Sequence, residues 1–272
     1  MSERTHYPPG VPCWVETLQP DPDAATRFYS ELFGWQYDGP GPMPGEPPGR
    51  YFVARLRGRD VAGVGSKPAQ APPGAFWATY IAVQSVDRVA AQAGDAGGAA
   101  VVAPFDVAPA GRMAVLRDRA GATFCVWEAE QRHGAELVNE PQAWAMSSLI
   151  TRDPDGARSF YARLFNWKTE SLDAGESAIY LCRLSGYVGG EPKQPVPRDV
   201  VAVMLPACDT FPDDRSAEWS VDFWIDDADA AALKAEALGA NVLVSPYDAP
   251  GFRRATIADP QGAVFTISQL RY

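Results

Sequence analysis

A segment that occurs twice constrains the fold of this 272-residue chain more than any other feature. Asp21–Trp35 returns as Asp153–Trp167, with Asp-Pro, Phe-Tyr, Leu-Phe and Trp at matching positions. In both copies Asp precedes a Pro, which is favoured in the first helical turn because its missing N–H costs nothing there. The apolar residues that follow have the spacing of one helix face, and a Gly or Asn comes after them, as is common at helix ends. Each copy therefore predicts a short amphipathic helix that leads into a strand.

The repeat continues through both halves of the chain. Trp77 and Asp118 have counterparts in Trp219 and Asp259, within similar alternations of strand-like and helix-like segments. Each half reads strand–helix–strands twice, which predicts four βαβββ modules. The predicted boundaries are a first domain at 8–130 with modules 8–68 and 75–130, a linker at 131–141, and a second domain at 142–272 with modules 142–192 and 217–272.

Two segments are predicted to be irregular. Tyr37–Gly49 is too rich in Pro and Gly for regular structure, and Pro192–Glu218 contains Pro-Val-Pro and an Asp-Asp-Arg run. Loops of this length are either functional covers or mobile.

Composition excludes several classes of function. The net charge is −10 with no basic cluster, so neither nucleic acid nor membrane is an expected partner. The expected partner is a small-molecule ligand, for the reasons given below. No apolar run approaches the roughly 20 residues that cross a bilayer, and the N-terminus lacks a signal-peptide core, so we expect a cytoplasmic protein. An oligomer is allowed but not required, so the chain is expected to be a monomer or a homodimer. The four cysteines, Cys13, Cys125, Cys182 and Cys208, form no C-x-x-C pair and are expected to be buried free thiols.

These motifs resemble the vicinal oxygen chelate superfamily, which contains glyoxalase I, bleomycin-resistance proteins, fosfomycin-resistance enzymes and extradiol dioxygenases. The resemblance rests on the two Asp-Pro helices, on Asp226–Asp229 and on the turn Asp259–Gly262. It covers nearly the whole chain and is most like the tandem-domain actinobacterial proteins similar to the mycobacterial 27 kDa antigen. It implies an α+β fold in which four modules form two tandem domains, each an open curved mixed sheet with the substrate inside. Function is less constrained, because the superfamily contains lyases, transferases and dioxygenases as well as binding proteins.

The positions of the superfamily's metal ligands are not occupied by ligand residues in this chain. A divalent site needs at least three convergent His, Glu, Asp or Cys side chains, and only Cys125 is of that kind. The two histidines, His6 and His133, lie outside the modules. The resemblance therefore implies no cofactor and no metal at the usual place, with Glu191 the only nearby carboxylate for an unconventional site. The positions carried over are Trp14, Ala78 and Cys125 in the first half and Met146, Ser220 and Thr266 in the second.

Strand alternation extends these positions to a predicted interior lining, because residues two apart share a face. The lining is aromatic and apolar with a few carboxylates and hydroxyls, which suits a flat or hydrophobic small molecule. The predicted ligand-binding residues are Trp14, Glu16, Tyr80, Cys125 and Trp127 in the first domain and Met146, Ser148, Ser220, Asp222, Trp224 and Thr266 in the second.

Glu16 and Asp222 are the candidates for catalysis. A carboxylate among Trp14, Tyr80 and Trp127 would have a raised pKa and could act as a general acid or base. Alternatively, Glu16 pairs with an arginine such as Arg112 or lies at a solvated mouth, and the same logic applies to Asp222.

Several other residues carry a functional and a structural reading. Arg112 and Arg253 would clamp an anion or, as favoured, form salt bridges that stabilise their hairpins. Trp35 and Trp167 are expected in the core, Cys125 is expected to be an inert thiol, and the Asp-Pro-Asp segments are expected to be helix caps rather than calcium loops.

Three functions remain open from the sequence. The first is a metal-free protein that binds a hydrophobic or aromatic metabolite or an antibiotic. The second is a metal-independent isomerase, lyase or hydrolase that uses Glu16 or Asp222 for proton transfer on a polyketide-like substrate. The third is a metal-dependent lyase, transferase or dioxygenase with atypical ligands.

Overall fold

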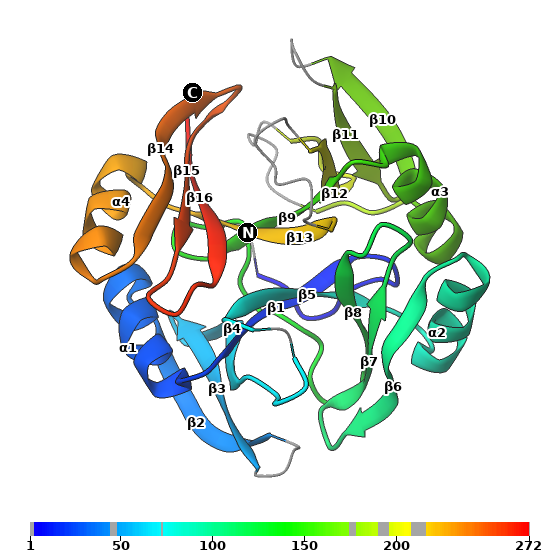
Figure 1. Ribbon diagram of the computed structural model, residues 1–272, viewed down its shortest axis with the longest axis horizontal. Coiled ribbons are helices and arrows are strands. Elements are labelled where there is room, and N and C mark those ends of the chain that lie inside the picture. Colours follow the sequence, from blue (N-terminus) through cyan, green and yellow to red (C-terminus); the bar gives the residue numbers. More distant parts are fainter. Residues whose placement is uncertain are drawn as a thin grey trace.

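The computed structural model describes residues 3–43, 48–71, 73–173, 178–189, 196–207 and 216–271 (Figure 1). Glu191 and Cys208, which were among the residues considered above, lie outside the described residues. No helix in the described part of the chain is long and apolar enough to cross a membrane.

The first domain is a curled mixed sheet of eight strands with two helices. Its strand order is β2-β3-β4-β1-β5-β8-β7-β6, in which β1 pairs parallel with β4 and β5 parallel with β8. The elements are β1 (Pro12–Gln19), α1 (Pro22–Phe33), β2 (Gln36–Met43), β3 (Gly49–Leu56), β4 (Arg59–Ser66), β5 (Phe76–Ala82), α2 (Val86–Asp95), β6 (Ala99–Val107), β7 (Gly111–Arg117) and β8 (Thr123–Ala129).

The second domain repeats this order, which confirms the prediction of two tandem domains with the α+β fold. Its sheet runs β10-β11-β12-β9-β13-β16-β15-β14, again with two parallel pairs, β12 with β9 and β13 with β16. The elements are β9 (Trp144–Thr151), α3 (Pro154–Phe165), β10 (Lys168–Asp173), β11 (Ala178–Arg183), β12 (Val200–Pro206), β13 (Glu218–Trp224), α4 (Ala228–Ala237), β14 (Asn241–Ala249), β15 (Phe252–Ala258) and β16 (Val264–Leu270).

The repeated segment forms α1 and α3, and its Asp residues cap both helices as predicted. The Asp21 carboxylate accepts a hydrogen bond from the backbone N–H of Ala24 at 3.0 Å, and Asp153 accepts one from Gly156 at 2.9 Å. Each carboxylate therefore satisfies a backbone donor that the first helical turn leaves unpaired. At the other end, Asn166 adopts a left-handed conformation with φ of 58°, which ends α3.

The prediction of an irregular segment at Tyr37–Gly49 is wrong for its first part. Gln36–Met43 forms β2, which pairs antiparallel with β3. β2 is the outer strand of its sheet, where Pro is tolerated because one side of the strand needs no ladder hydrogen bonds. The register shifts between Asp38 and Gly41, around Gly39 and Pro40. The second irregular prediction is likewise wrong at Val200–Pro206, which forms β12.

The two sheets meet back to back at β5 and β13. Thr79 and Ser147 share a hydrogen bond of 2.8 Å between their hydroxyls and are fully buried. Both side chains project from the face opposite to Tyr80 and Ser148, because neighbouring residues in a strand alternate in direction. The concave faces of the two sheets therefore turn away from each other.

The helices bind the two domains together crosswise. α1 lies beside α4 of the second domain, and α3 lies beside α2 of the first (Figure 1). The Tyr29 hydroxyl donates a hydrogen bond of 2.8 Å to Asp259 in the β15–β16 turn, and the Tyr161 hydroxyl donates one of 3.1 Å to Asp118 in the β7–β8 turn. The tyrosine of each repeat thus bonds to a turn of the other domain. Trp35 and Trp167 stack on these tyrosines in the core, as predicted.

Candidate ligand site

The concave face of the first domain brings its predicted residues together. Trp14 lies opposite Tyr80, and Glu16 lies opposite Ala78, in the antiparallel pairing of β1 with β5. Tyr80 in turn lies opposite Cys125 on β8. Because residues opposite each other share a face of the sheet, these side chains all project into the same interior. Their roles in binding or catalysis stay predictions.

Both carboxylate oxygens of Glu16 accept hydrogen bonds from tyrosines. Tyr80 donates to Oε1 at 2.6 Å and Tyr51 donates to Oε2 at 2.8 Å, while the indole N–H of Trp14 donates to the Tyr51 hydroxyl at 3.0 Å. Glu16 is only 5 % exposed, so it does not lie at a solvated mouth. The alternative pairing with Arg112 is also wrong, because Tyr51 and Tyr80 take the place of a cation.

Arg112 and Arg253 form salt bridges on the outside of their hairpins, as the favoured reading predicted. Arg112 reaches Asp106 on the facing strand at 2.6 Å, and Arg253 reaches Asp248 on its own facing strand at 3.1 Å. Each guanidinium also contacts a carboxylate in the first turn of the neighbouring helix, at 2.9 and 2.6 Å. Two carboxylates each leave these arginines little capacity to bind an anionic ligand.

Tyr51 was missed by the sequence reasoning, although the sequence carries a signal for it. Its ring lies over β4, where a Cβ on Gly63 would collide with the Tyr51 ring and with Glu16. A Cβ on Gly65, the next residue on that face, would come within 3.1 Å of the ring. Two glycines at alternate positions of a strand mark a place where a bulky group approaches the backbone.

The environment of Glu16 shifts its protonation equilibrium. Burial raises the pKa of Glu16, and the hydrogen bonds from Tyr80 and Tyr51 oppose this without cancelling it. Burial, and then the charge of Glu16, raises the pKa of the Cys125 thiol well above its ordinary value. Cys125 therefore favours the neutral thiol, consistent with the prediction of an inert residue.

Glu16→Gln is expected to flatten the dependence of stability on pH. A carboxyl whose folded-state pKa is raised stabilises the fold below its ordinary pKa of 4.5, and this stability is lost as pH rises through the folded-state pKa. The free energy of unfolding of Glu16→Gln should therefore rise relative to that of the wild type as pH increases from 4.5. The rise is about 1.4 kcal/mol for each tenfold increase in the proton affinity of Glu16 on folding. Urea unfolding from pH 4.5 to 8 measures this, with the exposed Glu31→Gln as the matched substitution. A constant difference across that range would contradict it.

The concave face of the second domain gathers a different set of polar residues. Asp222 lies opposite Met146 on β9 and opposite Thr266 on β16. Its Oδ2 accepts hydrogen bonds from Arg254 and from Ser268, both at 2.7 Å. Its Oδ1 is completely buried and has no hydrogen-bond partner among the described residues. Burial raises the pKa of Asp222, and the charge of Arg254 opposes this most strongly, followed by the hydrogen bonds from Ser268 and Arg254.

Arg254 is the second interior residue that the sequence reasoning missed. It follows Arg253, and strand alternation places one of the two inside and the other outside. Arg254 also donates to the Ser268 hydroxyl at 3.1 Å, so the arginine, serine and aspartate form one closed cluster. Asp222 is therefore paired with an arginine, as the structural alternative predicted, but only through Oδ2.

The interiors differ in the size of the side chains at matching positions. The first domain carries large aromatic residues around its carboxylate: Trp14, Tyr80 and Trp127 are buried, and Tyr51 packs against the same cluster. The second domain carries smaller and more polar residues at the same places. Matched through the repeat and the strand registers, Trp14 corresponds to Met146, Glu16 to Ser148, Tyr51 to Ile179, Tyr80 to Asp222, and Trp127 to Ser268.

The residues at the superfamily's metal positions do not fit a divalent cation. Such ions need several imidazoles or carboxylates. These positions carry instead an indole (Trp14), a methyl group (Ala78), a thioether (Met146), two hydroxyls (Ser220 and Thr266) and one thiol (Cys125). Across the described ranges, no group of three or more His, Cys, Asp or Glu side chains is arranged to hold a metal.

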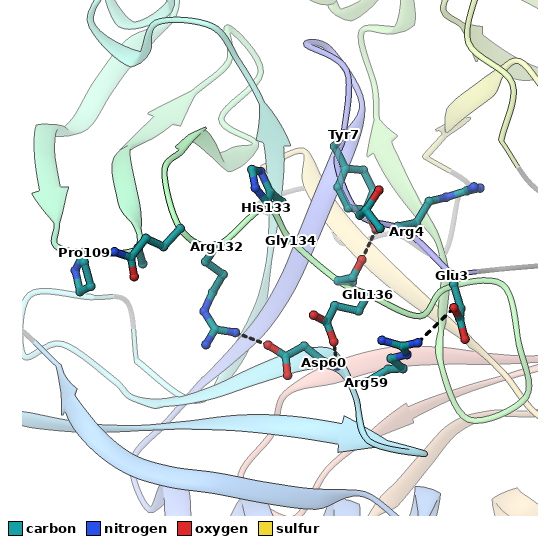
Figure 2. Close-up of a pocket in the computed structure, with 14 residues that line it drawn as sticks. Glu3, Arg4, Tyr7, Arg59, Asp60, Pro109, Arg132, His133, Gly134 and Glu136 are labelled. Carbon is teal, nitrogen blue, oxygen red and sulfur yellow. Dashed lines mark hydrogen bonds and ion pairs between the residues drawn. The ribbon is translucent and has the colours of Figure 1, made fainter.

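A cavity of about 540 Å³ lies apart from the predicted interior residues of both domains (Figure 2). It is bounded by the N-terminal segment, the start of β4 and residues 131–136. Two ion pairs lie in its wall: Asp60 with Arg132, and Arg59 with Glu3 at 3.2 Å. Tyr7 donates to the carbonyl of Ala135 at 2.7 Å. None of the predicted site residues lines this cavity, so it is distinct from the predicted site.

Comparisons with known proteins agree with the fold and the repeat. Residues 14–126 match the glyoxalase/bleomycin resistance protein/dioxygenase superfamily, and residues 146–268 match the glyoxalase-like domain family. The chain belongs to this superfamily.

Its relatives and structural neighbours cover nearly its whole length. It is 38 % identical to "Putative glyoxylase CFP32" of Mycobacterium bovis over 98 % of this chain and 97 % of that protein. It is 31 % identical to the anthracycline biosynthesis protein DnrV of Streptomyces peucetius, over 98 % and 96 %. The Mn(II)-bound glyoxalase of Novosphingobium aromaticivorans has a similar fold, with a TM-score of 0.63 at 15 % identity over 96 % of this chain and 82 % of its own.

Proposed function

We propose that this chain is a metal-free small-molecule-binding protein that holds a hydrophobic or aromatic compound inside its second domain. The observation that carries the proposal is the contrast between the two interiors. In the first domain, aromatic side chains surround Glu16 and satisfy both of its oxygens. In the second domain, smaller residues stand at the matching places and, within the described residues, Asp222 keeps one unpaired oxygen. The second interior is therefore the one with unmet capacity for a ligand.

The chemistry of the second interior suits such a ligand. Met146 and Trp224 are half-buried and offer apolar surface, while Ser148, Ser220 and Thr266 offer hydroxyls on the same face. Small-molecule sites commonly combine a mostly apolar lining with a few polar groups that fix orientation. The relative DnrV, which is named for anthracycline biosynthesis, supports a role connected with a compound of that kind, and that name belongs to the relative.

Acid/base catalysis without a metal is a second candidate, and the free oxygen of Asp222 favours it. A carboxylate held on one side by Arg254 and Ser268 presents its other oxygen in a fixed direction, as a general base requires. Glu16 suits this role less, because both of its oxygens already accept hydrogen bonds.

Titration with a panel of aromatic compounds, followed by quenching of the eight tryptophans, tests the binding function. We expect saturable quenching that Trp224→Phe largely removes, because Trp224 shares the second interior with Asp222. Trp127→Phe is the matched control, since Trp127 lines the first interior, and should keep the response. No saturable response from any member of the panel, or a stoichiometric metal found by elemental analysis, would count against the proposal.

A further inference from the structure

The unpaired oxygen of Asp222 defines what a ligand must supply. Asp222 is 7 % exposed, and its Oδ1 is out of contact with solvent and with any donor in the described residues. A buried carboxylate oxygen without a donor has lost its hydration and gained nothing in exchange. A ligand that brings a hydrogen-bond donor to this oxygen removes that deficit, whereas a ligand without a donor leaves it in place.

The first domain shows which donor fits an interior carboxylate of this fold. There the hydroxyls of Tyr80 and Tyr51 donate to Glu16 at 2.6 and 2.8 Å. Tyr80 stands at the position that Asp222 takes in the second domain, and Tyr51 stands at the position of Ile179. In the second domain Ser148 stands at the position of Glu16 and the carboxylate of Asp222 stands at that of Tyr80, so neither phenol is present there. Within the described residues Oδ1 therefore lacks a donor that a ligand could supply.

The surroundings of Asp222 select against a cationic donor. Arg254 contacts Oδ2 at 2.7 Å and already compensates the charge of the carboxylate. An ammonium group at Oδ1 would stand near the guanidinium without an unbalanced negative charge to hold it. Met146 lies opposite Asp222, and Trp224 lies two residues further along the same face, so apolar surface flanks the oxygen. A thioether and an indole pack well on an aromatic ring.

We propose that Asp222 Oδ1 accepts a hydrogen bond from a phenolic hydroxyl of the ligand, and that the second domain binds neutral hydroxylated aromatic compounds. This inference rests on the proposed binding function and adds the chemical class of the ligand to it. In this arrangement Asp222, Arg254 and Ser268 form the polar anchor, and Met146 and Trp224 contact the ring.

Equilibrium dialysis of the full chain with 2-naphthol and with 2-methoxynaphthalene tests the inference, because the methyl ether removes the donated proton and keeps the ring system. We expect 2-naphthol to bind the wild type at least tenfold more tightly, as a hydrogen bond to a charged acceptor provides. In Asp222→Asn the amide oxygen can keep the contacts with Arg254 and Ser268, while the amide N–H₂ replaces the acceptor. The preference should then fall to within about threefold. Glu31→Gln, an exposed substitution on α1 of the first domain, should leave the preference unchanged.

The outcomes separate this inference from the proposed function. Equal binding of both probes by the wild type would overturn the inference and leave the binding function standing. Binding of neither probe would also overturn the inference, and the panel titration then decides the binding function separately. Because Asp222→Asn could fold poorly, Met146→Trp provides a second variant that keeps Asp222 and introduces the residue of the first domain at the matching position. It should abolish binding of both probes, and unchanged binding would place their site elsewhere and contradict the inference.

Discussion

Asp259→Ala is expected to lower the free energy of unfolding by about 3–5 kcal/mol, since it leaves several buried donors unpaired at once. Asp259 Oδ1 accepts the backbone N–H groups of Gln261 and Ala263, both at 2.9 Å, which closes the β15–β16 turn. Its Oδ2 accepts the Tyr29 hydroxyl at 2.8 Å and the Gln19 amide at 2.7 Å, both from the first domain. One side chain thus holds a turn and an interface between domains, and urea denaturation measures its loss.

Asp118→Ala should have a similar but smaller effect. Asp118 closes the β7–β8 turn in the same way, through the N–H groups of Ala120 and Ala122 at 2.9 Å. Its Oδ2 accepts the Tyr161 hydroxyl at 3.1 Å, and no glutamine of the described chain contributes a second bond in the way Gln19 does at the other turn. With one donor fewer, the loss should be smaller by about 1 kcal/mol.

Two further substitutions control these measurements. Asp259→Asn keeps an acceptor for the turn and loses only the contacts at Oδ2, so it should destabilise less than Asp259→Ala. Asp95→Ala removes an exposed carboxylate at the end of α2 and should change stability by no more than about 0.5 kcal/mol. If Asp259→Ala were no worse than Asp95→Ala, the crosswise tyrosine–aspartate contacts would contribute nothing to stability.

These contacts also explain what the sequence could and could not predict about the fold. The spacing of Phe28, Tyr29, Leu32 and Phe33 predicts a helix with one buried face, and the structure has that helix with Asp21 as its cap. Periodicity identifies the buried face but not the element that covers it, because that element comes from a distant part of the chain. Contact with the β15–β16 turn of the second domain could therefore not be predicted from the repeat.

The candidate site was predictable to a similar degree. The alternation of β1 and β5 places Trp14, Glu16 and Tyr80 on one face, and the registers agree. What alternation does not give is the hydrogen-bond partner of a side chain. Tyr51 and Arg254 come from strands that reach the interior carboxylates only after the sheet curls, so the sequence suggested Arg112 for Glu16 instead.

The packing of the linker is another feature that the local sequence did not predict. Residues 131–141 are polar overall, which predicts a simple connection between domains. In the structure Ala135, Leu137 and Val138 of this segment are buried, and the N–H of Ala135 donates to the carbonyl of Cys13 on β1 at 2.8 Å. The linker is therefore a packed part of the first domain, held against the strand that carries Glu16.

Gly134→Ala is expected to be among the most damaging substitutions in this linker, at about 3–5 kcal/mol. Gly134 has a φ of +131°, a conformation that residues with an L side chain rarely adopt. A Cβ there would collide with the carbonyl oxygen of Cys13 and come within 2.9 Å of the Tyr7 ring. Because the obstacle is backbone of β1, it cannot rotate away as a flexible side chain could.

Gly186→Ala separates the two causes of that loss. Gly186 also has a positive φ, of +82°, but a Cβ there would meet nothing within 4 Å in the described part of the chain, so only backbone strain of about 1–2 kcal/mol is expected. The difference between the two variants in urea denaturation measures how strongly the linker is held against Cys13. If Gly134→Ala lost no more than Gly186→Ala, the linker would be free to move off β1, and the strand of Glu16 would be stabilised by its sheet neighbours alone.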